Sequence, residues 1–260
     1  QPPSACAASP EALADCVDAE AYQSDLEFIA DLRVPGTTHW QAVQDLCADR
    51  LTELGYEVEL FEYGSGVNVL GSRPGSMPDA PRIIIGAHYD HIEDCAGADD
   101  NATGVAGALE AARVLAQADF ARTLTIACWD EEERGLLGSE AFATAAAEQG
   151  IPIGVYFNFE MIGYASDEPD TQQLPTGFDL IFPDQIAMIE ANDNRGDFLF
   201  LTGDPGSADA VADLQTQGAR VDLPVVALTL NEQQVSNPLF GDLRRSDHAP
   251  FWDQGFPAIF

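Results

Sequence analysis

The sequence predicts a three-layer α/β fold, with a mixed but mostly parallel central sheet and helices on both of its faces. Four apolar runs of strand length recur along the chain, at 82–87, 123–129, 154–159 and 224–230. Continuous runs rich in β-branched residues are typical of strands that are buried on both faces. Helical patterns separate the first three runs, and this alternation favours parallel strands joined by helical crossovers.

The first part of the chain predicts two helices and then two strands. Ser9 followed by Pro10 is typical of a helix start. Apolar residues then recur at helical spacing before Gly55, which is a typical helix stop. The expected elements are, in order, a helix from Pro10 to about Asp31, a loop over 32–38, a helix ending at Gly55, a half-exposed strand over 56–60, and a further strand after 64–69.

The remaining segments complete the predicted domain. Apolar residues over 105–115 recur with a period of 3.6, and an Ala-rich helix is expected over 140–149. Residues 163–206 are rich in Gly, Asp and Pro, and we expect them to form excursions over one face of the same domain. The prediction is therefore one domain over 1–260, with an N-terminal extension at 1–24.

The charge of the chain limits its partners. The 260 residues include 44 acidic and 11 basic ones, for a net charge of −33. Nucleic acid and anionic membrane surfaces are poor partners because phosphates would be repelled. No apolar run is long enough to span a membrane. The acidic excess is compatible with cation binding or with surface solvation in a salty setting, and only carboxylates beside His or in dense runs favour the former.

The N-terminus and the cysteines indicate in which cellular compartment the protein is located. The sequence begins at Gln1 without a visible signal peptide, and we expect a processed protein that is secreted or periplasmic. Cys6 and Cys16 lie in a small-residue stretch typical of exported proteins, in which disulfides are expected. Cys95 and Cys128 lie beside the candidate site and either pair with each other or remain free buried thiols.

A histidine ends the first buried strand. His88 follows three consecutive isoleucines, at the carboxyl end where an α/β sheet gathers its binding residues. A single histidine there is more often structural, but Asp90 stands two residues on and can hold the other imidazole nitrogen, as in many metal sites. His91 is a weaker candidate that is also compatible with only shaping the loop.

Carboxylates follow the other predicted strands. Asp99 and Asp100 precede the helix over 105–115, where a helix cap explains one of them but not both. The acidic run 130–133 follows the second buried strand, and Glu160 follows the third. Metal-assisted hydrolysis needs one carboxylate to hold the metal and another to take a proton from the attacking water. Adjacent glutamates can supply both.

Five motifs, in this order and spacing, resemble the M28 family of co-catalytic zinc peptidases over most of the chain from about residue 25. They are Gly-Ala-His-Tyr-Asp at 86–90, Gly-Ala-Asp-Asp-Asn-Ala-Thr-Gly at 97–104, Glu-Glu-Arg-Gly-Leu-Leu-Gly-Ser at 132–139, Asn-Phe-Glu-Met-Ile-Gly at 158–163 and Ser-Asp-His-Ala-Pro-Phe at 246–251. The resemblance implies two zinc ions as the cofactor of a complete site.

The resemblance also implies a role for each matched residue. The expected metal ligands are His88, Asp100, Glu133 and Glu160, with Asp100 bridging the two ions. Glu160 stands where the family usually has Asp, so the carboxylate is kept on an arm longer by one methylene. The expected general base is Glu132, the partner behind His88 is Asp90, and the residues lining the substrate pocket are Asp247 and His248.

The resemblance leaves one ligand without a residue. In the family the second histidine ligand comes from a Tyr-His-Thr-like segment after the strand that here ends at Phe260. We expect the C-terminal end of the domain to be missing from this chain. The alternative is that His248 takes the place of that ligand.

The predicted function is zinc-dependent hydrolysis of N-terminal peptide bonds, with a metal-activated water and Glu132 as general base. The partner is a peptide substrate, and the oligomeric state stays open. Three alternatives remain: a carboxypeptidase or dipeptidase on the same fold, a glutaminyl cyclase with one zinc ion, and a metal-binding domain with an incomplete site.

Overall fold

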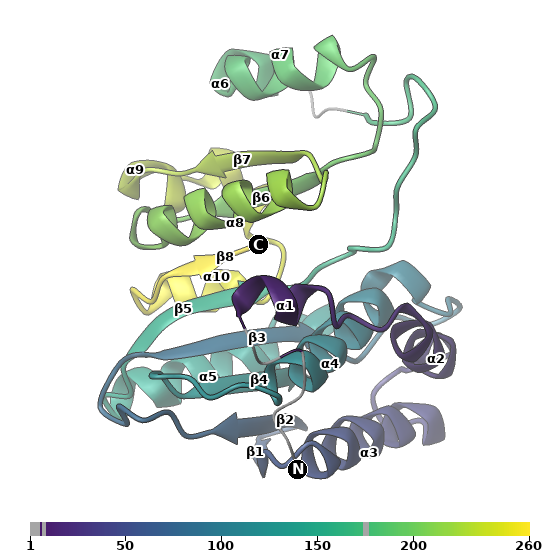
Figure 1. Ribbon diagram of the computed structural model, residues 1–260, viewed down its shortest axis with the longest axis vertical. Coiled ribbons are helices and arrows are strands. Elements are labelled where there is room, and N and C mark those ends of the chain that lie inside the picture. The colour runs from purple at the N-terminus through teal and green to yellow at the C-terminus, as the bar shows by residue number, and fades with distance from the viewer. Residues whose placement is uncertain (1–5, 7–8, 174–176) are drawn as a thin grey trace.

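Eight strands form one mixed sheet in the computed structural model, which describes residues 6, 9–173 and 177–260 (Figure 1). The strands are β1 (Glu57–Tyr63), β2 (Gly66–Arg73), β3 (Arg82–His88), β4 (Leu124–Trp129), β5 (Ile153–Asn158), β6 (Leu199–Gly203), β7 (Val225–Thr229) and β8 (Ala258–Ile259). Their order across the sheet is β1-β2-β4-β3-β5-β8-β6-β7. The central strands β4, β3, β5 and β8 run parallel, whereas β1, β2 and β6 pair antiparallel to a neighbour.

Helices cover both faces of this sheet. They are α1 (Pro10–Ala14), α2 (Ala19–Ile29), α3 (Thr38–Glu53), α4 (Gly104–Leu115), α5 (Leu137–Glu148), α6 (Phe178–Ile181), α7 (Pro183–Ala191), α8 (Ala208–Arg220), α9 (Glu232–Val235) and α10 (His248–Asp253). One face is covered by α3, α4 and α8, and the opposite face by α5 and α10 (Figure 1). The predicted three-layer α/β fold is confirmed.

Strand β4 shows why the central strands are rich in apolar residues. Its alternate residues Leu124, Ile126 and Cys128 join the core beneath α3 and α4. Ala127 and Trp129 point the other way, into the core beneath α5 and α10. Because successive side chains alternate between faces, a strand covered on both sides has no polar face.

The register of the parallel strands places the candidate site. Strand β3 lies between β4 and β5, with His88 opposite Trp129 and Gly86 opposite Asn158. The carboxyl ends of all three strands therefore meet at one edge of the sheet. Residues that follow these ends come together although the sequence separates them widely, which is the usual position of a binding site in such folds.

The predicted single helix from Pro10 to Asp31 is wrong, because the segment forms two helices. Helix α1 begins as expected, with the Ser9 hydroxyl accepting from the Ala12 N–H. A second start follows at Asp18, whose carboxylate accepts from the N–H groups of Glu20 and Ala21. An aspartate cap of this kind satisfies free amides at the beginning of α2 and breaks the run.

Segment 163–206 contains more regular structure than expected. It holds α6, α7 and β6, and β6 enters the main sheet beside β7 and β8. Helices α6 and α7 lie beyond β7, at the top of Figure 1. The abundance of Gly, Asp and Pro hid these elements because turn residues separate short helices and a five-residue strand.

The cysteines pair in one way only. Cys6 and Cys16 form a disulfide. The suggested Cys95–Cys128 pair is wrong, since Cys128 is buried in β4 and Cys95 is exposed. Cys47, on α3, is the remaining buried free thiol. Among the described residues, the longest apolar helices fall short of what a membrane crossing requires.

Candidate metal centre

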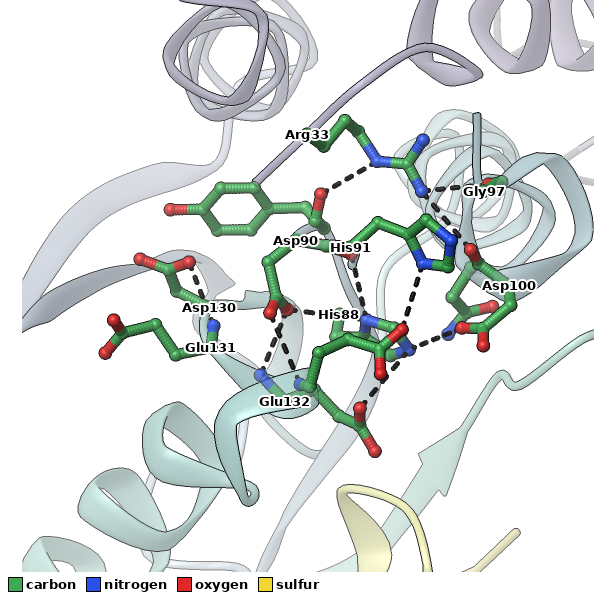
Figure 2. A network of polar contacts seen from close by, with 12 residues as sticks. Arg33, His88, Asp90, His91, Gly97, Asp100, Asp130, Glu131 and Glu132 are labelled. Atoms are coloured by element: carbon green, nitrogen blue, oxygen red, sulfur yellow. Dashed lines mark hydrogen bonds and ion pairs between the residues drawn. The ribbon is translucent and has the colours of Figure 1, made fainter. Parts of the chain in front are cut away.

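His88 faces three carboxylates at the carboxyl edge of the sheet, two of which, Asp100 and Glu132, are seen beside it in Figure 2. Its ring is 1% exposed, and its Nε2 lies 3.2 Å from Asp100 Oδ1, 3.4 Å from Glu160 Oε2 and 3.9 Å from Glu132 Oε2. The three carboxylates come from the turn before α4, from the end of β5 and from the turn after β4. Ligand atoms of His88, Glu132 and Glu160 lie within 4.8 Å of one another, so these three residues are within reach of one ion.

A second group of ligand atoms lies beside the first. His91, Asp100 and Glu133 each offer a ligand atom within 4.8 Å of the others. His91 Nδ1 lies 2.9 Å from Glu133 Oε1. Since Asp100 also contacts His88, its carboxylate lies between the two groups, where a bridging ligand would be placed.

Asp90 ties the two strand ends together. Its carboxylate lies 3.4 Å from His88 Nδ1 and accepts from the N–H groups of Glu132, at 3.0 Å, and Glu133, at 3.3 Å. A carboxylate behind a metal-binding histidine fixes the orientation of the ring. Here the same group also fixes the turn that carries both glutamates, so Asp90 sets the relative position of the ends of β3 and β4.

The preceding aspartate anchors this turn to the rest of the fold. Asp130 is fully buried and accepts from Trp40 Nε1 at 2.8 Å, from the Val67 N–H at 3.0 Å and from the Glu131 N–H at 2.9 Å. Glu131 adopts a left-handed conformation with φ of 55°, which turns the chain so that Glu132 faces the site. The acidic run is therefore built into the fold and is not a solvated surface segment.

A chain of hydrogen bonds holds Glu160 from the opposite side. Trp129 Nε1 donates to the Tyr156 hydroxyl at 2.7 Å, which donates to Asn158 Oδ1 at 2.6 Å. Asn158 Nδ2 donates to the Ser246 hydroxyl, which donates to Glu160 Oε2, both at 2.7 Å. Buried networks in which each group is paired fix side-chain positions closely. Ser246 is thereby assigned a positioning contact that the sequence did not predict.

Burial and neighbouring charges shift the pKa values of the titratable groups in the site. Burial raises the pKa of Glu132 to about 9, and Asp247, Glu160 and Glu133 add to that rise. Burial also raises the pKa of Glu133. For His88 burial acts to lower the pKa, but the Glu160 charge and the bonds to Asp100 and Asp90 outweigh it and raise the pKa well above the ordinary value. Shifts of this kind are common at binding and catalytic sites.

The residues predicted to line the pocket lie deeper than the ligands. Asp247 is fully buried, and its burial raises its pKa to about 7. His248 Nε2 lies 2.9 Å from the Leu243 carbonyl oxygen, and the ring packs on Trp252 and Phe260. His248 belongs to neither of the two ligand groups formed by the described residues. The substrate-pocket role of both residues stays a prediction.

The donor sets fit divalent zinc. Imidazole nitrogen and carboxylate oxygen are zinc ligands, and each group supplies one histidine with carboxylates. Among the described residues, both ring nitrogens of His91 and Glu133 Oε1 are buried without a hydrogen-bond partner. Buried polar atoms without partners are rare in folded proteins, and a bound cation would satisfy these.

His91 is the site residue that sequence reasoning underrated. Its only signal was its position directly after Asp90, in a loop already expected to approach the site. The sequence could not show that the loop over 91–97 folds back and places the ring beside Glu133, because that fold depends on contacts with the distant Arg33.

Two curated proteins are similar to this chain in sequence. The uncharacterised protein YfbL of Escherichia coli is 32% identical over 193 residues, covering 70% of this chain and 55% of YfbL. Leupeptin-inactivating enzyme 1 of Streptomyces exfoliatus is 32% identical over 174 residues, covering 62% of this chain and 39% of that enzyme. The chain thus spans about half the length of the curated relatives it matches.

The fold is shared with a solved aminopeptidase. The LapA aminopeptidase of Legionella pneumophila superposes with a TM-score of 0.70 at 19% identity, over 96% of this chain and 62% of LapA. The model of peptidase family M28 matches residues 68–260, which include all five motifs and both ligand groups. The chain is therefore a member of peptidase family M28.

Proposed function

We propose that this chain is the catalytic domain of a zinc-dependent aminopeptidase with two metal ions. The observation that carries the proposal is the position of Asp100, which contacts His88 in one ligand group and belongs to the other. His88 and Glu160 would hold one ion and Glu133 the other, with Asp100 between them. Membership of a peptidase family supports the reaction type.

Glu132 is the proposed general base. When bound, the zinc ions would polarise both the attacking water and the peptide carbonyl. Glu132 would take the proton of that water and deliver it to the leaving amine. Burial raises its pKa to about 9, and positive charge held by the neighbouring ligands would lower that value, because a cation stabilises the charged carboxylate.

The cavity beside the site supports a substrate with a free amine. A cavity of about 620 Å³ opens next to Glu160, and its lining also carries the carboxylates of Asp99 and Asp242. None of the described residues that line it is Lys, Arg or His. A carboxylate surface attracts an ammonium group and repels a carboxylate, so an N-terminal residue fits here better than a C-terminal one.

The same cavity supports a preference for large apolar side chains. Its walls are mostly apolar and come from the segment after β5, from α7 and the residue before it, from β6 and from the residue after β8; they include Ile162, Phe182, Ile186, Phe200 and Phe260. An apolar side chain gains roughly 25 cal/mol for each Å² that it buries. Leu or Phe should therefore be the preferred first residue of the substrate.

A panel of matched peptides tests the proposal. We expect a Leu-initiated tripeptide to be cleaved with a free or an amidated C-terminus, and to resist cleavage when its N-terminus is acetylated. The reverse pattern would show a carboxypeptidase: the N-acetylated peptide would be cleaved, and the C-terminally amidated peptide would resist cleavage. A Gln-initiated peptide that loses ammonia without releasing free Gln would show a glutaminyl cyclase.

The Glu132→Gln variant separates the base from the ligands. We expect it to keep its zinc content and to lose at least about 100-fold in kcat, the range typical of a missing general base. Glu133→Gln is the matched neighbour and should lose zinc. A Glu132→Gln protein that hydrolyses normally, or that loses zinc like its neighbour, would contradict the proposed role. Absence of hydrolysis in the zinc-loaded wild type would favour a metal-binding domain.

We also infer that the protein acts outside the cytosol, in a secreted or periplasmic location. The Cys6–Cys16 disulfide supports this, since disulfides persist in oxidising compartments. Thiol labelling of protein from its native source tests it: Cys6 and Cys16 should resist labelling until a reductant is added, and immediate labelling would contradict it.

A further inference from the structure

His91 lies in a position that its hydrogen bonds do not explain. The residue is 3% exposed, and neither ring nitrogen has a hydrogen-bond partner among the described residues. Its Nδ1 lies only 2.9 Å from Glu133 Oε1, which also has no hydrogen-bond partner. The two atoms are close, yet they are not aligned as donor and acceptor. Two ligand atoms that point at the same cation are placed in this way, close together but not aligned for a hydrogen bond with each other.

The fold holds the ring in this place. The His91 N–H donates to the Arg33 carbonyl oxygen at 3.1 Å, which fixes the backbone. Gly97 has φ of 57°, and a Cβ at that position would lie 2.6 Å from the ring. Only glycine leaves room for the imidazole here and adopts that backbone conformation readily. Two distant parts of the chain therefore converge on the placement of His91 (Figure 2).

We propose that His91 donates a ring nitrogen to the second metal ion, together with Asp100 and Glu133. This assignment rests on the proposed two-ion centre and adds a ligand that the family resemblance does not supply. Each ion would then have one imidazole, from His88 or His91, one glutamate, from Glu160 or Glu133, and a share of the Asp100 carboxylate, which contacts His88 and belongs to the second group. One nitrogen and two oxygens leave a fourth position open, as catalytic zinc sites require.

The composition of the chain makes a direct test possible. The protein has only four histidines: His39, His88, His91 and His248. We would label the imidazole nitrogens isotopically and record their NMR signals while zinc is added to the metal-free wild type. The proposal expects two rings, His88 and His91, to give shifts typical of metal-bound nitrogen. His39, whose Nε2 lies 3.2 Å from the Ile29 carbonyl oxygen, and the buried His248 should keep theirs.

A binding measurement with variants completes the test. Calorimetric titration should find two tight zinc ions in the wild type and one in His91→Ala. The second ion should bind more than about 100-fold more weakly, beyond the usual loss when an outer hydrogen-bond partner of a ligand is removed. His39→Ala is the matched control and should bind like the wild type. Thermal unfolding of His91→Ala with and without zinc verifies that the variant is folded.

The outcomes separate this inference from the proposed function. If zinc leaves the His91 signals in place, His91 is not a ligand, whether or not the protein hydrolyses peptides. If both rings bind zinc but no peptide is cleaved, the ligand assignment stands and the proposed function fails. Binding of a single ion to the wild type would overturn both the assignment and the two-ion centre.

Discussion

Arg33 is a fully buried cation whose partners are backbone oxygens. Its guanidinium donates to the carbonyl groups of Ile29 at 2.9 Å, Tyr89 at 3.0 Å, Ala96 at 2.8 Å and Gly97 at 2.9 Å. These carbonyls belong to α2 and to the loop that carries Asp90 and His91. The arginine therefore joins α2 to the loop that carries Asp90 and His91.

Replacing Arg33 should be costly. We expect Arg33→Met to lose about 3 kcal/mol of unfolding free energy, because several buried carbonyls would lose a charged donor. Arg33→Lys should recover only part of the lost unfolding free energy, since an ammonium group has fewer N–H donors than a guanidinium and lacks its planar geometry. Arg50, whose side chain is 43% exposed and pairs with Asp25, is the control. Its substitution by Met should cost no more than about 1 kcal/mol. Equal losses in urea unfolding would contradict this account.

The hydrogen bond from Ser246 to Glu160 should matter for zinc affinity. We expect Ser246→Ala to weaken zinc binding about 10- to 100-fold, the usual cost of removing a partner that orients a ligand. Ser207 is a matched control, because its hydroxyl is also buried and donates to the Asp204 carbonyl oxygen at 3.0 Å. Ser207→Ala should leave the affinity unchanged. Similar affinities for the wild type and Ser246→Ala would show that the network does not hold Glu160 in place.

At the scale of single residues, the sequence predicted the site best where a histidine or carboxylate directly follows a strand. His88, the acidic run after β4 and Glu160 could be located because each follows an apolar run directly. The sequence could not predict the buried position of His91 or the Ser246–Glu160 bond, because both depend on contacts between residues far apart in the chain. It also could not predict that His248 would turn toward Leu243 and away from the ligands.

At the scale of elements, burial on two faces explains which strands the sequence revealed. Strands β3 and β4 are nearly continuous in apolar residues, since cores lie on both sides of them. Strand β6 and helix α8 carry weaker signals: only Val211 and Gly218 of α8 are buried. An amphipathic helix with so few buried residues is hard to separate from a polar loop, and β6 is short.

The difference between central and edge strands can be measured. Ile126 in β4 is fully buried, whereas Leu60 in the edge strand β1 is 53% exposed. We expect Ile126→Ala to cost about 2–5 kcal/mol, through lost apolar burial and the cavity left behind. Leu60→Ala should cost less than about 1 kcal/mol, because its side chain keeps much of its contact with water. Comparable losses in denaturant unfolding would be incompatible with the two-faced burial of β4.

At the scale of the whole molecule, negative charge concentrates where cations are expected. The chain carries −33 overall, and the site gathers Asp90, Asp100, Glu132, Glu133 and Glu160 around two histidines. Burial, reinforced by repulsion from neighbouring carboxylates, raises the pKa of Glu132 to about 9 and also raises the pKa of Glu133. The overall charge predicts solubility and cation affinity, but only the fold shows which carboxylates act together.

The metal-free protein should lose stability as pH rises. Burial raises the pKa of Asp247 from 3.8 to about 7 and that of Asp130 to about 6, so the folded state keeps protons that the unfolded chain has released. Each such proton lowers the unfolding free energy by about 1.4 kcal/mol per pH unit between the two pKa values. The raised pKa of His88 acts in the same direction, above its ordinary value.

Unfolding in urea with a chelator, at about pH 5, 6 and 7, measures how the unfolding free energy of the metal-free protein changes with pH. Asp247→Asn should flatten it, because the amide has no proton to lose. Saturating zinc should oppose it, since ligand deprotonation favours metal binding. A metal-free protein that becomes more stable from about pH 5 to 7 would contradict the burial of these carboxyl groups.

The central claim is that two ions held around Asp100 make this domain an aminopeptidase. Its most direct test is the rate of Leu release from a Leu-initiated peptide as zinc is added stepwise to the metal-free protein. The account predicts that release rises until two equivalents are bound, and that the N-acetylated peptide stays intact throughout. No release at any zinc level, or equal cleavage of the acetylated peptide, would contradict it.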